Sequence, residues 1–206
     1  ADIEEPLIAV LERMQQHGIA LDTAYLNELS TDFHTKLTAI EEQIFEHAGH
    51  EFNVNSPKQL GEVLFDELGL APKNAKKTAG GQRSTRESEL TKLQGEHPII
   101  DEILTYREYQ KLLSTYIDPL PELVGEDGRL RTTFLQTGTT TGRLASRDPN
   151  LQNIPARGEH GQAIRRAFVA EEGFRLVGID YSQIELRIAA MLSGDPNLID
   201  IFRRGE

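Results

Sequence analysis

The sequence contains no cysteine, no tryptophan and only two methionines among its 206 residues. Without cysteine, disulfides and thiolate metal sites are excluded, which fits a reducing compartment. The sequence contains no run of about 18 apolar residues, so it predicts no membrane-spanning helix. The N-terminal residues lack the charged segment followed by an apolar one that is typical of a secretory signal. We therefore expect a cytoplasmic protein, associated with the nucleoid if the source is bacterial.

Basic residues are also scarce, because 22 Lys and Arg stand against 33 Asp and Glu, for a net charge of −11. Taken as a whole, this charge argues against a nucleic-acid partner. The charge is unevenly distributed, however: residues 1–70 hold fourteen acidic and three basic residues. Residues 71–94 hold six basic against two acidic residues, and residues 129–166 hold seven against two. Such basic stretches can form a phosphate-binding groove, and the alternative is that they are solvated faces.

With 38% apolar residues, the chain can bury the core of one or two domains. Apolar periodicity and capping residues predict mostly helices up to about residue 120. Pro6 suits the first turn of a helix, and further helices are expected to start at Asp22, Ser56, Ser84, His97 and Asp195. A short helix is expected over residues 161–167. Alternating side chains predict a strand over residues 130–137, and residues 168–169 predict a short one. The mixture predicts an α+β fold.

The most informative stretch is residues 174–192, FRLVGIDYSQIELRIAAML. Its β-branched, apolar start predicts a buried strand that ends at Asp180. A helix is expected to follow, with Ser182 as its N-cap and Glu185 completing a capping box. A carboxylate at such a position either hydrogen-bonds the helix N-terminus or acts as a metal ligand or acid–base group.

Residues 180–187, DYSQIELR, resemble the first palm motif of the DNA polymerase I family (family A DNA polymerases). Residues 141–155, TGRLASRDPNLQNIP, are similar to the segment just upstream of that motif, and weaker similarity runs through the rest of the chain. The resemblance implies three segments. Residues 1–27 would form an N-terminal helix packing with the palm, residues 28–120 a helical thumb, and residues 121–206 the first part of a palm with a small antiparallel sheet.

The resemblance implies nucleotidyl transfer from deoxynucleoside triphosphates to a primer 3′-hydroxyl, assisted by two Mg²⁺ ions. Asp180 would bridge the two ions, and the carbonyl of Tyr181 would be a further ligand. Glu185 would crowd the sugar C2′ position and so reject ribonucleotides, with the capping box as its structural alternative. Arg187 matches the motif without an assigned role, and a structural ion pair is one interpretation.

The resemblance also implies contacts with a primer–template duplex. Phosphates would be bound by thumb residues, namely Lys76, Lys77, Arg83, Ser84, Thr85, Arg107 and Lys111. Hydroxyls and backbone donors at a helix start do bind anions, but a flexible surface loop is the alternative for residues 72–83. Arg107 and Lys111 lie four residues apart, which predicts a common exposed stripe. The family often has another basic residue where this chain has Leu113, which weakens the expected phosphate contact there.

The minor groove would be contacted by Arg143, Asn150, Gln152 and Asn153, because amides and arginine can bond base edges. From the residues alone, Asn150 and Asn153 are turn residues that satisfy their own backbone. The family's triphosphate-binding helix and its His-Asp-Glu motif are absent from the 206 residues. We therefore expect a fragment that binds duplex DNA weakly, self-associates through an incomplete palm and does not polymerise alone. A non-catalytic DNA-binding module is the main alternative and an acidic helical scaffold a weaker one; replication and DNA repair are not separated.

Overall fold

The computed structural model describes residues 2–70 and 83–205, and the chain divides into two compact units, Ala1–Val169 and Ala170–Glu206. These two units do not correspond to the three segments that the resemblance implies, residues 1–27, 28–120 and 121–206. The boundaries of those segments stay predictions. Within the described ranges, helices dominate and the strands form two small antiparallel sheets, which confirms the predicted α+β class. None of the helices in the described ranges is long and apolar enough to cross a membrane.

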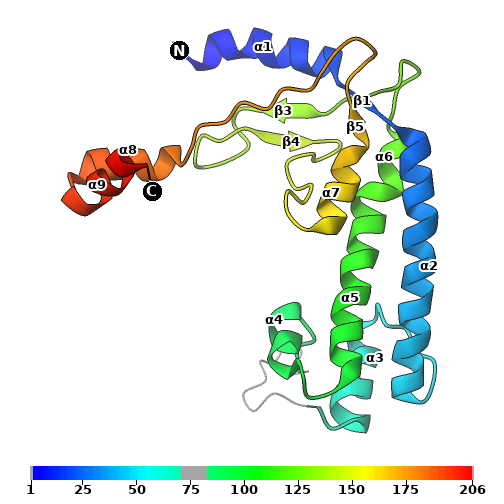
Figure 1. Cartoon of the computed structure of the whole chain (residues 1–206). Helices are drawn as coiled ribbons and strands as arrows, with labels where there is room; N and C mark the ends of the chain where they lie inside the picture. The colour runs from blue at the N-terminus through cyan, green and yellow to red at the C-terminus, as the bar shows by residue number, and fades with distance from the viewer. Residues whose placement is uncertain (1, 71–82, 206) are drawn as a thin grey trace. The chain divides into compact units, whose positions relative to one another are not determined.

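Two long helices run side by side through the first unit, α2 (Thr23–Ala48) and α5 (Pro98–Leu112) (Figure 1). The Asp22 carboxylate accepts the Tyr25 N–H at 2.9 Å and so caps α2, as predicted. The side chain of His97 caps α5 by accepting the Ile99 N–H at 3.2 Å, and Pro98 occupies the first helical position. The π-helical turn η3 (Leu113–Ile117) continues α5.

Short helices follow both ends of this pair. At one end lie α3 (Pro57–Gly61), η1 (Glu62–Glu67), α4 (Glu87–Leu90) and η2 (Thr91–Leu93), and α6 (Pro119–Glu122) follows η3. Ser56 caps α3 as predicted. The prediction that Ser84 caps the next helix is wrong, because α4 begins only at Glu87 and the Ser84 hydroxyl accepts the Arg86 N–H instead.

The larger sheet has β1 (Ile19–Leu21) between β2 (Arg129–Leu130) and β5 (Phe168–Val169), with all pairs antiparallel. A second sheet pairs β3 (Thr133–Leu135) with β4 (Ala145–Arg147). The strand β4 was not predicted from the sequence. The predicted strand over residues 130–137 is therefore divided. Thr132 lies at the break, and its hydroxyl donates to the carbonyl oxygens of Arg147 and Pro149 at 3.0 and 2.7 Å.

The helix α1 (Glu4–His17) precedes β1, and α7 (Glu159–Arg166) precedes β5. Gly18 ends α1 with φ 63°, and a Cβ there would lie 2.5 Å from the carbonyl oxygen of Leu130. This close approach of β1 to β2 requires glycine. The larger sheet thus connects α1 and α7 to the two long helices of the first unit.

Among its described residues, the first unit has two hydrophobic clusters. One joins the N-terminal half of α2 to η3, the larger sheet and α7, and it includes Leu26, Phe33 and Ile117. The other joins the C-terminal end of α2 to η1, α4 and α5. Leu113 belongs to the first cluster and is only 1% exposed, so this position faces the core. A phosphate contact from Leu113 is excluded by its burial as well as by its apolar side chain.

The second unit contains α8 (Ile184–Ser193) and α9 (Pro196–Arg204). The carboxylate of Asp195 caps α9 by accepting the N–H groups of Asn197 and Leu198, as predicted. The predicted buried strand before Asp180 is wrong: residues 174–179 form no strand, and Ile179 is 93% exposed. A strand needs a neighbour for its backbone groups, and no segment in the described ranges pairs with this one.

The predicted capping box of α8 is also wrong. The residue that precedes the helix is Gln183, in a left-handed conformation with φ 52°, and no side chain caps the helix. Ser182 and Glu185 therefore do not form the reciprocal pair that their spacing indicates.

Candidate functional site

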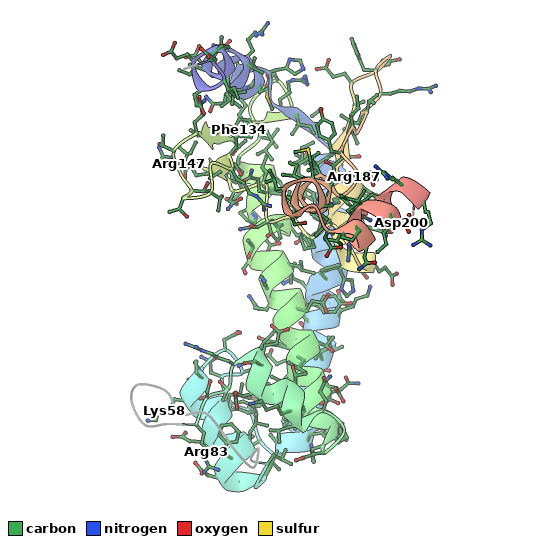
Figure 2. The ribbon with its side chains drawn as sticks, turned by 90° about the vertical axis from the view of Figure 1, so that its left-hand side faces the viewer. Lys58, Arg83, Phe134, Arg147, Arg187 and Asp200 are labelled. Carbon is green, nitrogen blue, oxygen red and sulfur yellow. The ribbon has the colours of Figure 1, made fainter. Side chains whose placement is uncertain are left out.

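The residues predicted to bind DNA separate into two groups within the first unit. Arg83 lies with Lys58 at one end of the long-helix pair, whereas Arg147 and Phe134 lie at the other end (Figure 2). The first group comprises Arg83, Ser84, Thr85 and Arg107, and the second the segment from Arg143 to Asn153, whereas Lys111 lies in the last turn of α5. Lys76 and Lys77 lie outside the described residues.

Arg83 is engaged within the protein. Its guanidinium forms an ion pair with Asp66 at 2.7 Å and lies 5.1 Å from the centre of the Phe65 ring. Both partners come from η1, seventeen residues or more before Arg83 in the sequence. To contact a phosphate, this guanidinium would have to exchange the Asp66 carboxylate for the phosphate oxygen.

Arg107 is engaged as well. Its guanidinium donates to the carbonyl oxygen of Thr85, and at 3.5 Å to the Thr85 hydroxyl. Burial lowers the pKa of Arg107, and the nearby Glu87 carboxylate opposes this effect. The prediction of a common exposed stripe with Lys111 is wrong for Arg107, which is half-buried, whereas Lys111 is exposed.

Ser84 and Thr85 are buried, with 7% and 6% of their surface exposed. The interaction with Arg107 holds Thr85 beside α5. A Cβ at Gly61 of α3 would lie 3.7 Å from the Thr85 methyl group, so this methyl group also lies close to α3. Whether these hydroxyls contact a duplex stays a prediction. The structure shows that such a contact would be made from a segment that the protein already orders.

Within the second group, the turn that begins at Asn150 is stabilised by the side-chain amides of Asn150 and Gln152. The side-chain oxygen of Asn150 accepts the Gln152 N–H at 3.1 Å and the Ser146 hydroxyl at 3.2 Å. The side-chain amide of Gln152 donates to the carbonyl oxygen of Leu144 at 3.0 Å. The turn interpretation of Asn150, a residue bonded to its own local backbone, is therefore confirmed.

Asn153 is different. Its side chain is exposed and makes no hydrogen bond with any residue in the described ranges. Its carbonyl oxygen instead accepts the hydroxyl of Tyr116, which comes from η3. Arg143, the remaining predicted minor-groove residue, is exposed, and its carbonyl oxygen accepts the Thr139 hydroxyl at 2.7 Å.

Sequence reasoning missed two residues that hold this segment, Tyr116 and Arg165. Arg165, on α7, donates to the carbonyl oxygens of Pro155 at 3.0 Å and Ile154 at 3.5 Å. Tyr116 is 4% exposed, and burial raises its pKa. No periodic pattern relates these positions to residues 153–155, so only the tertiary structure reveals the contacts.

The predicted metal-binding carboxylate lies in the second unit. Asp180 is exposed, makes no hydrogen bond or ion pair with any described residue, and is followed by Tyr181, which is 78% exposed. Glu185 is exposed in the first turn of α8. In the part of the chain that the structure describes, no three His, Asp or Glu side chains are grouped to hold a metal ion. Asp180 suits Mg²⁺ as one hard oxygen ligand, since this ion usually takes one or two carboxylates with waters and phosphates.

Arg187 has a structural role rather than the ion pair suggested from sequence. Its guanidinium donates to the carbonyl oxygen of Ser182 at 2.8 Å and lies 4.8 Å from the centre of the Phe202 ring. The first contact closes the turn before α8, and the second joins α8 to α9.

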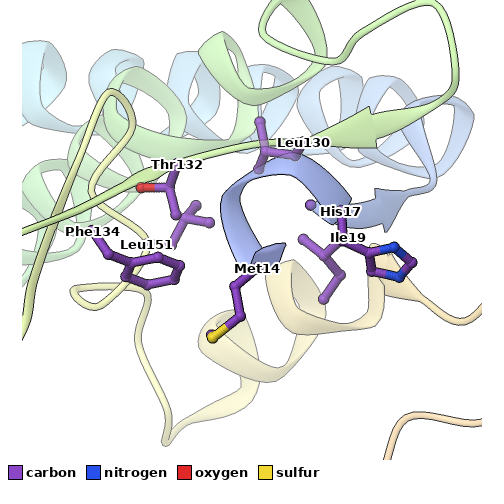
Figure 3. Close-up of a pocket in the computed structure, with 8 residues that line it drawn as sticks. Met14, His17, Ile19, Leu130, Thr132, Phe134 and Leu151 are labelled. Atoms are coloured by element: carbon purple, nitrogen blue, oxygen red, sulfur yellow. The ribbon is translucent and has the colours of Figure 1, made fainter. Parts of the chain in front are cut away.

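An apolar cavity of about 340 Å³ lies elsewhere, between α1 and the sheets (Figure 3). It is lined by Met14, His17, Gly18, Ile19, Leu130, Thr132, Phe134 and Leu151. None of the predicted metal-binding or DNA-binding residues contributes to this lining, so the cavity is not the candidate site.

Comparison with known proteins gives a consistent assignment. Residues 23–206 match DNA polymerase family A. The chain is 57% identical over 205 residues to the thermostable DNA polymerase I of Thermus thermophilus and 56% identical to that of Thermus aquaticus, covering 99% of this chain and 24% of each relative. The DNA polymerase I of Deinococcus radiodurans is 50% identical over 206 residues.

The fold is similar to that of the POL domain of Pol1 from M. smegmatis, solved in complex with DNA primer-template and dNTP. The TM-score is 0.88 at 43% sequence identity, over 98% of this chain and 36% of that one. This chain spans about a quarter of the length of the curated relatives. The two sequence blocks predicted this family, and the family match covers residues 23–206. The chain therefore belongs to DNA polymerase family A.

Proposed function

We propose that the protein containing this chain is a template-directed DNA polymerase, which transfers nucleotides from deoxynucleoside triphosphates to a primer 3′-hydroxyl. These 206 residues would supply part of the duplex grip and one metal-binding carboxylate. The observation that carries the proposal is the family match over residues 23–206, within which the DYSQIELR block presents Asp180 as an exposed carboxylate. The dNTP and primer-template bound by the related Pol1 domain support the same ligands here.

Asp180 and the carbonyl oxygen of Tyr181 would be the Mg²⁺ ligands contributed by this chain. When bound, two such ions lower the pKa of the primer hydroxyl and stabilise the leaving pyrophosphate. Glu185 follows Asp180 by five residues, at the start of α8, and would exclude a ribose 2′-hydroxyl. The exposure of Asp180 supports its role, because a ligand of a shared ion must be accessible to the substrate phosphates.

The duplex grip would have two parts. Arg83, Ser84, Thr85, Arg107 and Lys111, with Lys76 and Lys77, would bind phosphates at the thumb. Arg143, Asn150, Gln152 and Asn153 would contact the minor groove, where all correct base pairs offer acceptors. Cations that neutralise phosphates release counterions, so binding should weaken steeply as salt is added.

We further propose that the 206-residue chain does not polymerise by itself, since one carboxylate is too few to hold two Mg²⁺ ions. A primer-extension assay with Mg²⁺, all four deoxynucleotides and a labelled primer–template tests this. We expect no template-dependent incorporation by the chain alone, and loss of incorporation when Asp180→Asn is introduced into a full-length relative. Incorporation by the 206-residue chain would overturn the first expectation, and an active Asp180→Asn enzyme would overturn the role of Asp180.

A low-salt titration with a fluorescent duplex tests the grip separately. Binding that weakens with salt is expected, whereas no binding at the lowest salt concentration would contradict the proposed contacts. A non-catalytic DNA-binding module would also bind the duplex. It would remain inactive in every longer form of the protein, so primer extension by the full-length protein separates the two functions.

A further inference from the structure

Tyr116 is a buried residue with a polar group that serves a distant segment. Only 4% of its surface is exposed, and its ring lies in the cluster that joins α2, η3 and α7. Its hydroxyl donates to the carbonyl oxygen of Asn153, 37 residues further along the chain. A tyrosine hydroxyl is protonated at neutral pH, and burial raises the pKa of Tyr116 further, so the hydroxyl remains a donor.

The backbone that Tyr116 contacts is held at the next two residues as well. Arg165 binds the carbonyl oxygens of Ile154 and Pro155. Gly161 of α7 approaches Pro155 so closely that a Cβ there would lie 2.8 Å from its carbonyl oxygen. Three consecutive carbonyls are therefore fixed by side chains or by close packing, and Tyr116 holds the first of them.

The consequence falls on the Asn153 side chain. The amides of Asn150 and Gln152 are bonded within the protein, whereas the Asn153 amide is exposed and makes no hydrogen bond with the described residues. Since the direction of a side chain follows from its backbone, fixing the carbonyl of Asn153 also restricts where its amide points. A side-chain amide is a donor that matches the N3 and O2 acceptors of the minor groove.

We infer that Tyr116 is a positioning residue, whose hydroxyl holds the Asn153 backbone so that the Asn153 amide can donate to a minor-groove acceptor of a bound duplex. This inference rests on the proposed function for its ligand, but the positioning itself is a property of the free chain. Tyr116 would not touch the DNA.

The test compares Tyr116→Phe, which removes only the hydroxyl, with the matched variant Tyr106→Phe. Tyr106 is also buried, at 3% exposed, and belongs to the other hydrophobic cluster. Its hydroxyl donates to the Glu41 carboxylate and accepts from the side-chain amide of Asn55. Amide hydrogen exchange of the free 206-residue chain is measured at residues 151 and 152. One lost hydrogen bond predicts exchange about 2- to 12-fold faster in Tyr116→Phe, and no local change in Tyr106→Phe.

The second measurement uses two duplexes, one natural and one in which 3-deazapurines replace the purines and so remove the N3 acceptors. We expect the natural chain to bind the natural duplex about 2- to 12-fold more tightly. This preference should decrease in Tyr116→Phe and in Asn153→Ala, and should be unchanged in Tyr106→Phe. A loss of global stability alone would not change the ratio of the two affinities.

Unchanged local exchange in Tyr116→Phe would overturn the positioning role. A preference that Tyr106→Phe lowers as much as Tyr116→Phe would overturn it too. If the natural chain shows no preference between the duplexes, the minor-groove ligand is refuted together with that part of the proposed function. The exchange measurement then still decides the positioning, and primer extension by the full-length enzyme decides the polymerase activity separately.

Discussion

The ion pair between Arg83 and Asp66 should compete with DNA for the guanidinium. The two groups are 2.7 Å apart, and their side chains are 36% and 62% exposed. A pair this accessible to solvent contributes about 0.2–1 kcal/mol, because water and salt screen it. If Arg83 binds a phosphate in the complex, breaking this pair weakens duplex binding by that amount. Asp66→Asn should therefore increase duplex affinity by about 1.5- to 5-fold at low salt.

Fluorescence anisotropy with a short labelled duplex over a range of salt concentrations measures this effect. Asp66→Asn also changes the net charge, so Asp32→Asn serves as the matched control. Asp32 pairs with Lys36 at 2.8 Å on α2, and neither residue is predicted to bind DNA. Any gain common to both variants reflects the net charge, and only the excess in Asp66→Asn is assigned to Arg83.

Arg83→Gln completes the comparison. If Arg83 neutralises a phosphate, this variant should reduce the slope of log K against log salt concentration by about 0.9. Asp66→Asn should then have no further effect in the Arg83→Gln background, because the two residues act through one contact. An equal gain in Asp66→Asn and Asp32→Asn would refute the reasoning. So would a gain from Asp66→Asn that persists without Arg83.

Three further predictions concern stability and association. Hydrogen bonds from Arg131 lower the pKa of Asp127 to about 2, so this pair stabilises the fold above about pH 4 and its contribution is lost as the pH falls towards 2. Thermal unfolding of Asp127→Asn should therefore depend less on pH in that range than unfolding of the natural chain, and identical profiles would contradict this. Asp22→Ala should lower stability by about 0.5–2 kcal/mol through loss of the α2 cap, while Asp22→Asn stays close to the natural chain in denaturant unfolding. Met191 and Leu192 are 70% and 77% exposed on α8, so the natural chain should self-associate in sedimentation velocity. The double variant Met191→Lys/Leu192→Lys should reduce this association, whereas the control Ala39→Lys/Gln43→Lys, at exposed positions of α2, should not. A natural chain that stays monomeric at all concentrations would refute the prediction.

Local sequence patterns located the helices well and the strands poorly. The starts of α2, α3, α5 and α9 were predicted because a cap bonds an N–H group two or three residues away, so its signal is contained in adjacent residues. Strands depend on partners far along the chain. For this reason β4 was missed, and the apolar run at residues 174–179 was wrongly assigned to a buried strand.

The candidate site shows the same division. The two motif blocks identified the family and selected Asp180, and the comparisons confirmed the family. The alternative for Asn150, a turn residue bonded to its own backbone, was also available from the sequence, since that bond spans two residues. Net charge and spacing, however, treated Arg83, Arg107 and Lys111 as equivalent surface cations.

The sequence by itself determined the family, the α+β class, most helix starts and the identity of the candidate carboxylate, because these follow from residue types at fixed short separations. The tertiary structure alone decided which of the candidate groups are already engaged. It pairs Arg83 with Asp66, Arg107 with Thr85 and Tyr116 with Asn153, and it buries Leu113. The physical reason is that such contacts join residues between about 17 and 37 positions apart, and their geometry is set by how the helices pack rather than by any local pattern.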